Sequence, residues 1–95
     1  RKFESDKIVE QGSVEKAIGG CEGYLVPGGF GSRGWEGKIL TAHYCRTNNI
    51  PYFGLCLGMQ IMLVEFARYA LGLKQAHSTE VDPNTPDPVV SMLAE

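Results

Sequence analysis

The stretch Pro51-Tyr52-Phe53-Gly54-Leu55-Cys56-Leu57-Gly58-Met59-Gln60 decides the fold of this chain. The apolar run from Ile50 to Leu55 predicts a buried strand. A helix is expected after Cys56, because apolar residues recur there at the spacing of one helical face; they are Met59, Met62, Leu63, Phe66, Ala67, Ala70 and Leu71. Gly72 follows, where glycine commonly ends a helix. We therefore expect a strand that turns directly into a helix, with this apolar stripe in the core.

A second strand and a connecting helix precede this stretch. Tyr24-Leu25-Val26 is apolar and β-prone and closes at Pro27-Gly28-Gly29, and residues Glu36 to Asn48 place apolar side chains at helical spacing. With the later strand they form a βαβ unit, whose strands are parallel and whose connection is right-handed. Because a two-stranded parallel sheet needs further strands and covered faces, we expect an α/β fold of which this chain holds only a part.

The flanking segments carry weaker signals. Residues 1–11 are polar and weakly patterned, whereas Ser13 is a good helix N-cap ahead of the apolar face of Val14 to Ile18. Downstream, the proline-rich segment from Asp82 to Pro88 excludes a helix or a central strand. Val89-Val90 then favours a further strand.

Composition narrows the classes of function. Ninety-five residues make one domain at most, and a net charge of −2 offers no basic face for nucleic acid or anionic lipid. The longest apolar run stops at Glu65, short of a membrane span. Three cysteines without a Cys-x-x-Cys pair suggest neither disulfides nor a metal site. Because residue 1 is Arg and the first Met is Met59, we expect a piece of a longer chain; the absence of a signal-peptide pattern makes the cytoplasm the default compartment.

Gly54-Leu55-Cys56-Leu57-Gly58 has the pattern of a nucleophile elbow, in which the nucleophile occupies a strained turn between strand and helix. Only small residues fit two positions before and after the nucleophile, and both positions are glycine here. A helix N-terminus favours the thiolate, which is the reactive form of cysteine. The backbone N–H groups of Leu57 and of Gly29, in the loop after the other strand, are the candidate oxyanion donors. The alternative is that Cys56 is an unreactive core cysteine.

The glycine-rich loop allows another interpretation. Gly29-Phe30-Gly31-Ser32-Arg33-Gly34 matches the G-x-G-x-x-G pattern of dinucleotide-binding folds, between a strand and a helix. Such folds hold a ribose with an acidic residue at the end of the second strand, where this chain has Tyr52 to Cys56. The loop is better explained as part of a site around Cys56, or as a plain tight turn.

Three segments carry a family resemblance: Leu25-Val26-Pro27-Gly28-Gly29-Phe30-Gly31, Gly54-Leu55-Cys56-Leu57-Gly58-Met59-Gln60 and His77-Ser78-Thr79-Glu80-Val81-Asp82-Pro83. From about Gly23 to Val90 the chain resembles the class I (Cys-His-Glu) glutamine amidotransferases, and among them the glutaminase domain of the CTP synthase family. The resemblance implies a flavodoxin-like α/β amidotransferase fold, with a parallel sheet flanked by helices and present only in part.

The resemblance also implies roles for individual residues. Cys56 matches the nucleophile of the family, and the backbones of Gly29 and Leu57 match its oxyanion donors. The family's glutamine contacts match Gly29, Leu57, Gly58, Met59, Gln60 and Glu80. The catalytic His and Glu of the family lie further downstream and have no counterpart before Glu95. Residues 1–95 are therefore expected to be the N-terminal part of an amidotransferase domain, inactive by themselves.

The activity implied by the resemblance is hydrolysis of glutamine to glutamate and ammonia. A synthetase domain of the same longer chain would use the ammonia for ATP-dependent amination of UTP to CTP, in pyrimidine biosynthesis. The resemblance places ATP and Mg²⁺ in that domain and no cofactor in this chain, with GTP as allosteric activator and a homo-oligomer as the complete enzyme. Two alternatives stay open: the glutaminase domain of another biosynthetic enzyme, and a non-catalytic, amidotransferase-like regulatory module.

Four other residues are weighed against ordinary structural roles. His43 has no acid predicted beside it, so we expect it to pack within the connecting helix. His77 lies between Cys56 and Glu80 in chain order, but the family's base comes later, so we do not expect His77 to be the base. Glu80 has the alternative of a solvated loop acid. Arg33 is either an exposed turn residue or, by the resemblance, part of a lid near the site.

Overall fold

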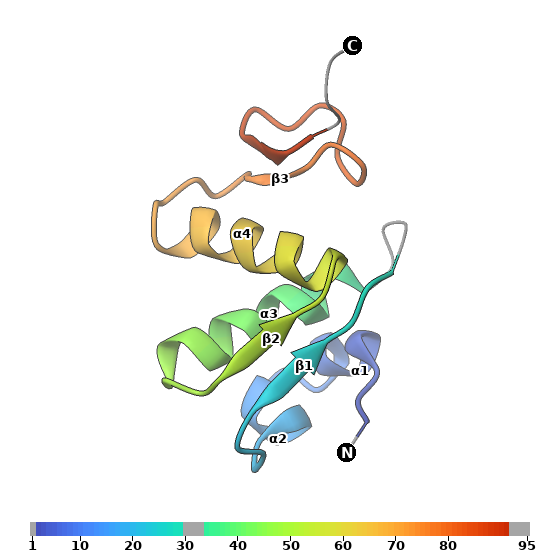
Figure 1. Cartoon of the computed structure of the whole chain (residues 1–95), viewed down its shortest axis with the longest axis vertical. Coiled ribbons are helices and arrows are strands. Elements are labelled where there is room, and N and C mark those ends of the chain that lie inside the picture. The colour runs from blue at the N-terminus through green and yellow to red at the C-terminus, as the bar shows by residue number, and fades with distance from the viewer. Residues whose placement is uncertain (1, 30–33, 92–95) are drawn as a thin grey trace.

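Two parallel strands and the helices beside them form the centre of the molecule (Figure 1). The computed structural model describes residues 2–29 and 34–91. β1 (Tyr24–Val26) pairs in parallel with β2 (Tyr52–Gly54). α3 (Trp35–Thr47) joins the two strands, and α4 (Leu57–Tyr69) follows β2 almost at once. The predicted βαβ unit and the strand-to-helix turn are confirmed.

Two short helices precede β1. α2 (Val14–Ile18) begins as predicted at Ser13, whose side chain accepts a hydrogen bond from the Lys16 N–H at 3.4 Å. α1 (Ser5–Glu10) was not predicted, because its polar sequence has one buried residue and no side-chain cap. Packing against α3 supports this helix: a Cβ at Gly37 of α3 would overlap the backbone of Ser5. Because Ser5 and Gly37 are far apart in the sequence, no local pattern of residues predicts this contact or the helix that it supports.

A second pair of strands lies beyond α4. β3 (His77–Ser78) and β4 (Pro88–Val90) are parallel, with an irregularity in register between His77 and Ser78. The strand expected at Val89-Val90 is therefore present, and the proline-rich segment connects it to β3. Both strands contact α4, on the side away from β1 and β2 in Figure 1.

The buried apolar residues form two clusters. One joins α3 to α4 and comprises Trp35, Ile39, Ala42, Leu57, Ile61 and Val64. The other joins α1 and α2 to β1 and α3 and comprises Ile8, Ile18, Tyr24 and Cys45. Tyr52 of β2 is partly buried and packs against both clusters. This side chain therefore links the two halves of the core.

The expectation that the apolar stripe of α4 lies in the core is wrong for most of its residues. Ala67 is buried, but Met59 is 50% exposed and Phe66 47% exposed, and Met62, Leu63 and Leu71 are exposed as well. α4 instead packs on α3 through the face of Leu57, Ile61 and Val64. The helix is apolar around most of its circumference, and such a helix is normally covered on all sides. Periodicity therefore identified an apolar face, but not the one that the described residues cover.

The end of α4 also differs slightly from the prediction. The helix ends at Tyr69 with Ala70 as its C-cap, so Gly72 lies one residue later than the expected position. Gly72 does adopt the left-handed conformation, with φ of +76°. Within the described ranges, no helix combines the length and the apolar character that crossing a membrane requires.

Candidate active site around Cys56

Cys56 occupies a strained turn between β2 and α4. Its φ of 50° and ψ of −104° are unusual for a residue with a side chain, and among the described non-glycine residues only Asn49 shares a positive φ. Such conformations cost about 1–3 kcal/mol and cluster at functional sites. The residue is exposed and stands at the N-cap of α4. This is the placement expected of a nucleophile on an elbow, and it is not that of a buried core cysteine.

The two elbow glycines are required by backbone crowding. A Cβ at Gly54 would lie 2.6 Å from the Gly58 carbonyl oxygen, and a Cβ at Gly58 would overlap the Val26 carbonyl oxygen. Both obstacles are main-chain atoms, which cannot swing aside as a flexible side chain would. The crowding expected from the Gly-x-Cys-x-Gly pattern is confirmed.

Among the described residues, the N–H groups in the first turn of α4 differ in whether they have a protein acceptor. The Gly58 N–H donates to the Leu55 carbonyl at 2.8 Å, and the N–H groups of Met59 and Gln60 donate to the Cys56 carbonyl at 3.0 and 3.2 Å. Within the described part of the chain, no acceptor is found for the Leu57 N–H. A free N–H immediately after a nucleophile suits an oxyanion donor.

The loop after β1 lies against the elbow. A Cβ at Gly28 would be 3.4 Å from the Cβ and 4.0 Å from the Sγ of Cys56. A Cβ at Gly29 would be 3.4 Å from a methyl carbon of Leu57 and 3.8 Å from the Lys38 Nζ. The structure thus brings together the elbow and the start of the glycine-rich loop. Residues 30–33, which include Arg33 and most of the G-x-G-x-x-G match, lie outside the described residues.

Glu80 comes from a separate part of the fold. It is exposed in the turn after β3, and its N–H donates to the Ser78 hydroxyl at 3.2 Å. Arg68 of α4 makes one of the contacts that hold the β3 segment to the rest, because its Nε donates to the Ala76 carbonyl at 2.8 Å. The same guanidinium pairs with Glu36 near the start of α3 at 3.1 Å. Arg68 therefore connects the segment that carries Glu80 to both large helices.

His77 has the surroundings of a packed residue. It is buried, its Nδ1 accepts the Ser78 N–H at 2.8 Å, and its ring centroid lies 5.1 Å from that of Trp35. Burial lowers the pKa of His77, and the nearby Arg68 lowers it further. Its imidazole is therefore neutral at pH 7, with one nitrogen already occupied. That His77 is not the catalytic base stays a prediction.

A buried acid that the sequence reasoning missed connects the two large helices. Glu65 of α4 is 1% exposed, and its carboxylate accepts hydrogen bonds from Arg46 Nε at 2.9 Å and Nη2 at 3.0 Å. His43 Nδ1 lies 3.1 Å from the same carboxylate. The expectation that His43 has no acid beside it is thus wrong. A glutamate inside an apolar helical run was the available signal, because a buried carboxylate requires a cationic partner.

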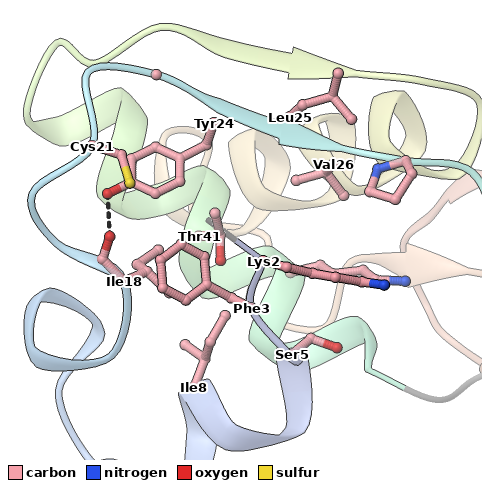
Figure 2. Close-up of a pocket in the computed structure, with 13 residues that line it drawn as sticks. Lys2, Phe3, Ser5, Ile8, Ile18, Cys21, Tyr24, Leu25, Val26 and Thr41 are labelled. Carbon is pink, nitrogen blue, oxygen red and sulfur yellow. Dashed lines mark hydrogen bonds between the residues drawn. The ribbon is translucent and has the colours of Figure 1, made fainter.

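A cavity of about 550 Å³ lies on another part of the molecule, beside β1 and between α1 and α3 (Figure 2). Figure 2 shows Phe3, Ile8 and Tyr24 along it, with the Tyr24 hydroxyl donating to the Ile18 carbonyl. Cys56 does not line this cavity. The nucleophile candidate therefore lies on the open surface and not in this hollow.

Comparison with known proteins places these features in a family. The family model described as "Glutamine amidotransferase class-I" matches residues 3–93. Relatives named CTP synthase include those of Protochlamydia amoebophila, 59% identical over the whole chain, and Pyrococcus abyssi, 54% identical over the whole chain. A third, from Chlamydia abortus, is 66% identical over 77% of the chain. The chain spans only 18%, 17% and 14% of these three relatives, respectively.

A solved structure shares the fold. It is described as the Trypanosoma brucei CTPS glutaminase domain with bound acivicin, and it matches 97% of this chain with a TM-score of 0.89 and 38% identity. The match covers 36% of that chain. The predicted α/β fold, with parallel strands flanked by helices, is confirmed.

Proposed function

Because this chain belongs to the class-I glutamine amidotransferase family, we propose that it is part of the glutaminase domain of a CTP synthase and that Cys56 is the nucleophile. The single observation that carries the proposal is the backbone of Cys56, strained at φ 50° on the turn between β2 and α4. The names of the relatives support the choice of enzyme within the family.

The reaction begins with attack of the Cys56 sulfur on the carbonyl carbon of the glutamine side-chain amide. The oxyanion that forms is stabilised by the N–H groups of Leu57 and Gly29. The carbon–nitrogen bond then breaks, and ammonia leaves with a proton that a base from the rest of the domain has taken from the thiol. Water attacks the resulting thioester, which releases glutamate and restores the thiol.

Glutamine binding uses the groups around the thiol. The first turn of α4, from Leu57 to Gln60, and the backbone of Gly29 border the reacting amide. Glu80 accepts the α-ammonium group of glutamine, because a cation in a partly desolvated pocket needs a carboxylate partner. Glu80 is exposed in the turn after β3.

The rest of the enzyme uses the ammonia. A synthetase domain converts UTP to CTP with ATP and Mg²⁺, GTP acts as an allosteric activator, and the complete enzyme is a cytoplasmic homo-oligomer. The described residues contain no group of three or more His, Cys, Asp or Glu side chains arranged to hold a metal ion. By the family resemblance, we assign ATP and Mg²⁺ to the other domain.

The test is Cys56→Ala in the complete enzyme. Glutamine-dependent CTP synthesis should fall by about 10⁴-fold or more, because the covalent step is lost. Synthesis from added ammonia should stay near the wild-type rate, because it bypasses the thiol. Cys21→Ser, which changes a cysteine away from the elbow, is the control and should retain both activities. Substantial glutamine use by Cys56→Ala would refute the assignment.

A further inference from the structure

We propose that Tyr52 is a positioning residue of the glutaminase site, whose hydroxyl holds the first turn of α4 in place. The inference rests on the function proposed above for Cys56. It arises from a hydrogen bond between β2 and α4: the Tyr52 hydroxyl donates to the Gly58 carbonyl at 2.7 Å. At the sequence level Tyr52 counted only as an apolar strand residue.

The hydrogen bond completes a set of three restraints on Gly58. Its N–H donates to the Leu55 carbonyl at 2.8 Å, and its Cα lies against the Val26 carbonyl. Tyr52 fixes the third group, the carbonyl oxygen. The N–H, Cα and carbonyl of Gly58 therefore each contact a neighbouring group, and together these contacts hold the first turn of α4 against the sheet.

The restrained turn carries the proposed oxyanion donor. The Leu57 N–H lies one residue before Gly58, so its direction depends on how this turn is oriented. An oxyanion donor contributes fully only when it already points at the position of the developing charge. Loss of the Tyr52 hydroxyl would thus act on catalysis through Leu57 without any contact between Tyr52 and the substrate.

The surroundings keep the Tyr52 hydroxyl protonated and able to donate. Burial raises the pKa of Tyr52, and the neighbouring Cys45 and Glu65 raise it further. The ring itself packs against both core clusters, and phenylalanine would keep that packing. Tyr52→Phe therefore removes the hydrogen bond while leaving the core filled.

The chain provides a matched control in Tyr24. It lies directly opposite Tyr52 in the sheet and is more deeply buried than Tyr52, and its hydroxyl donates to a backbone carbonyl, that of Ile18 in α2 (Figure 2). The Tyr24 bond anchors α2 and not the elbow. Tyr24→Phe thus removes an equivalent bond from the same sheet face, away from the reacting groups.

The experiment compares the two variants in the complete enzyme by steady-state kinetics with glutamine. Tyr52→Phe should lower kcat by about two- to tenfold, the value of one hydrogen bond, with KM within twofold of wild type. Ammonia-dependent synthesis should be unchanged. Tyr24→Phe should keep the wild-type kcat even if both variants lose similar thermal stability. An unchanged kcat in Tyr52→Phe, or an equal loss in Tyr24→Phe, would overturn the proposal.

Amide hydrogen exchange, measured by mass spectrometry, provides a readout that does not depend on the chemistry. Exchange across residues 57–60 should accelerate in Tyr52→Phe and stay at the wild-type rate in Tyr24→Phe. Unchanged exchange in Tyr52→Phe would overturn the positioning role. Because Cys56→Ala alone tests the glutaminase assignment, failure of that assignment and failure of the Tyr52 proposal give different results.

Discussion

At the scale of single residues, the backbone conformation of Cys56 lowers the stability of the fold at the residue that carries the proposed nucleophile. A φ of 50° with a ψ of −104° is a conformation that glycine adopts readily and that a residue with a Cβ adopts at a cost. The side chain is nevertheless cysteine, and its thiol is exposed at the N-terminus of α4. The strain is retained at the one position where a thiol is needed.

Relief of this strain should be measurable. Cys56→Gly should be more stable than Cys56→Ala by about 1 kcal/mol, because alanine retains the strained Cβ and glycine does not. Both variants lack the thiol and should be equally inactive with glutamine. The measurement is the thermal midpoint of the glutaminase domain in the complete enzyme, with ammonia-dependent activity as a check of folding. An alanine variant as stable as the glycine variant would show that the turn is unstrained.

The elbow could be predicted from sequence, whereas the role of Tyr52 could not. Glycine two residues before and two residues after Cys56 indicates backbone crowding in the sequence itself. The structure shows this crowding at Gly54 and Gly58. No sequence pattern predicts the hydrogen bond of the Tyr52 hydroxyl, because its acceptor depends on how β2 and α4 are arranged in space. A tyrosine in an apolar strand is equally compatible with simple packing.

At the scale of elements, α3 and α4 are joined by a charged contact inside an apolar interface. Glu65 is 1% exposed; its carboxylate pairs with Arg46 and contacts His43, whereas the Arg46 side chain is 38% exposed. The Glu65 side chain is thus shielded from water, whereas the Arg46 side chain is partly in contact with it. Removing one or the other should have unequal effects.

Arg46→Gln should destabilise the glutaminase domain more than Glu65→Gln does. The first leaves a buried carboxylate without the guanidinium that pairs with it, which costs about 3 kcal/mol or more. The second leaves an arginine that can turn toward solvent, and about 1 kcal/mol is expected from the lost hydrogen bonds. Denaturant unfolding of both variants checks the order. Equal losses would mean that Glu65 has partners beyond those seen here.

The elements themselves were largely predictable, and their packing was not. Ser13, the apolar run of β2 and the periodicity of α4 are local signals, and the corresponding elements are present. The face of α4 that packs on α3 is determined by residues distant in sequence. Met59 and Phe66 are exposed, so periodicity alone predicted the wrong face to be buried.

At the scale of the whole molecule, large apolar surfaces remain open on the described residues. Leu25 and Phe53, on the sheet face away from the core, are 58% and 60% exposed. The stripe of α4 adds Met62, Leu63 and Phe66. Exposed apolar area on this scale marks an interaction surface or a tendency to aggregate.

Residues 1–95 expressed alone should therefore fold poorly. We expect binding of the apolar dye 8-anilinonaphthalene-1-sulfonate, broad thermal unfolding and no Cys56-dependent turnover of glutamine. The complete glutaminase domain should bind little dye and unfold cooperatively. Cooperative unfolding of the isolated residues without dye binding would contradict this expectation.

The contact of Gly58 with the Val26 carbonyl has a consequence for the geometry of the whole site. It fixes the axial position of α4 relative to β1, so the helix cannot slide. Ten residues later Arg68 holds the Ala76 carbonyl, and a rise of about 1.5 Å per residue places the two anchor points about 15 Å apart along the axis. α4 is thus a spacer of fixed length between the thiol and the segment that carries Glu80. A single residue inserted between these anchors would turn Arg68 by about 100° and break its hydrogen bond to the Ala76 carbonyl, even though every residue of the site remained unchanged.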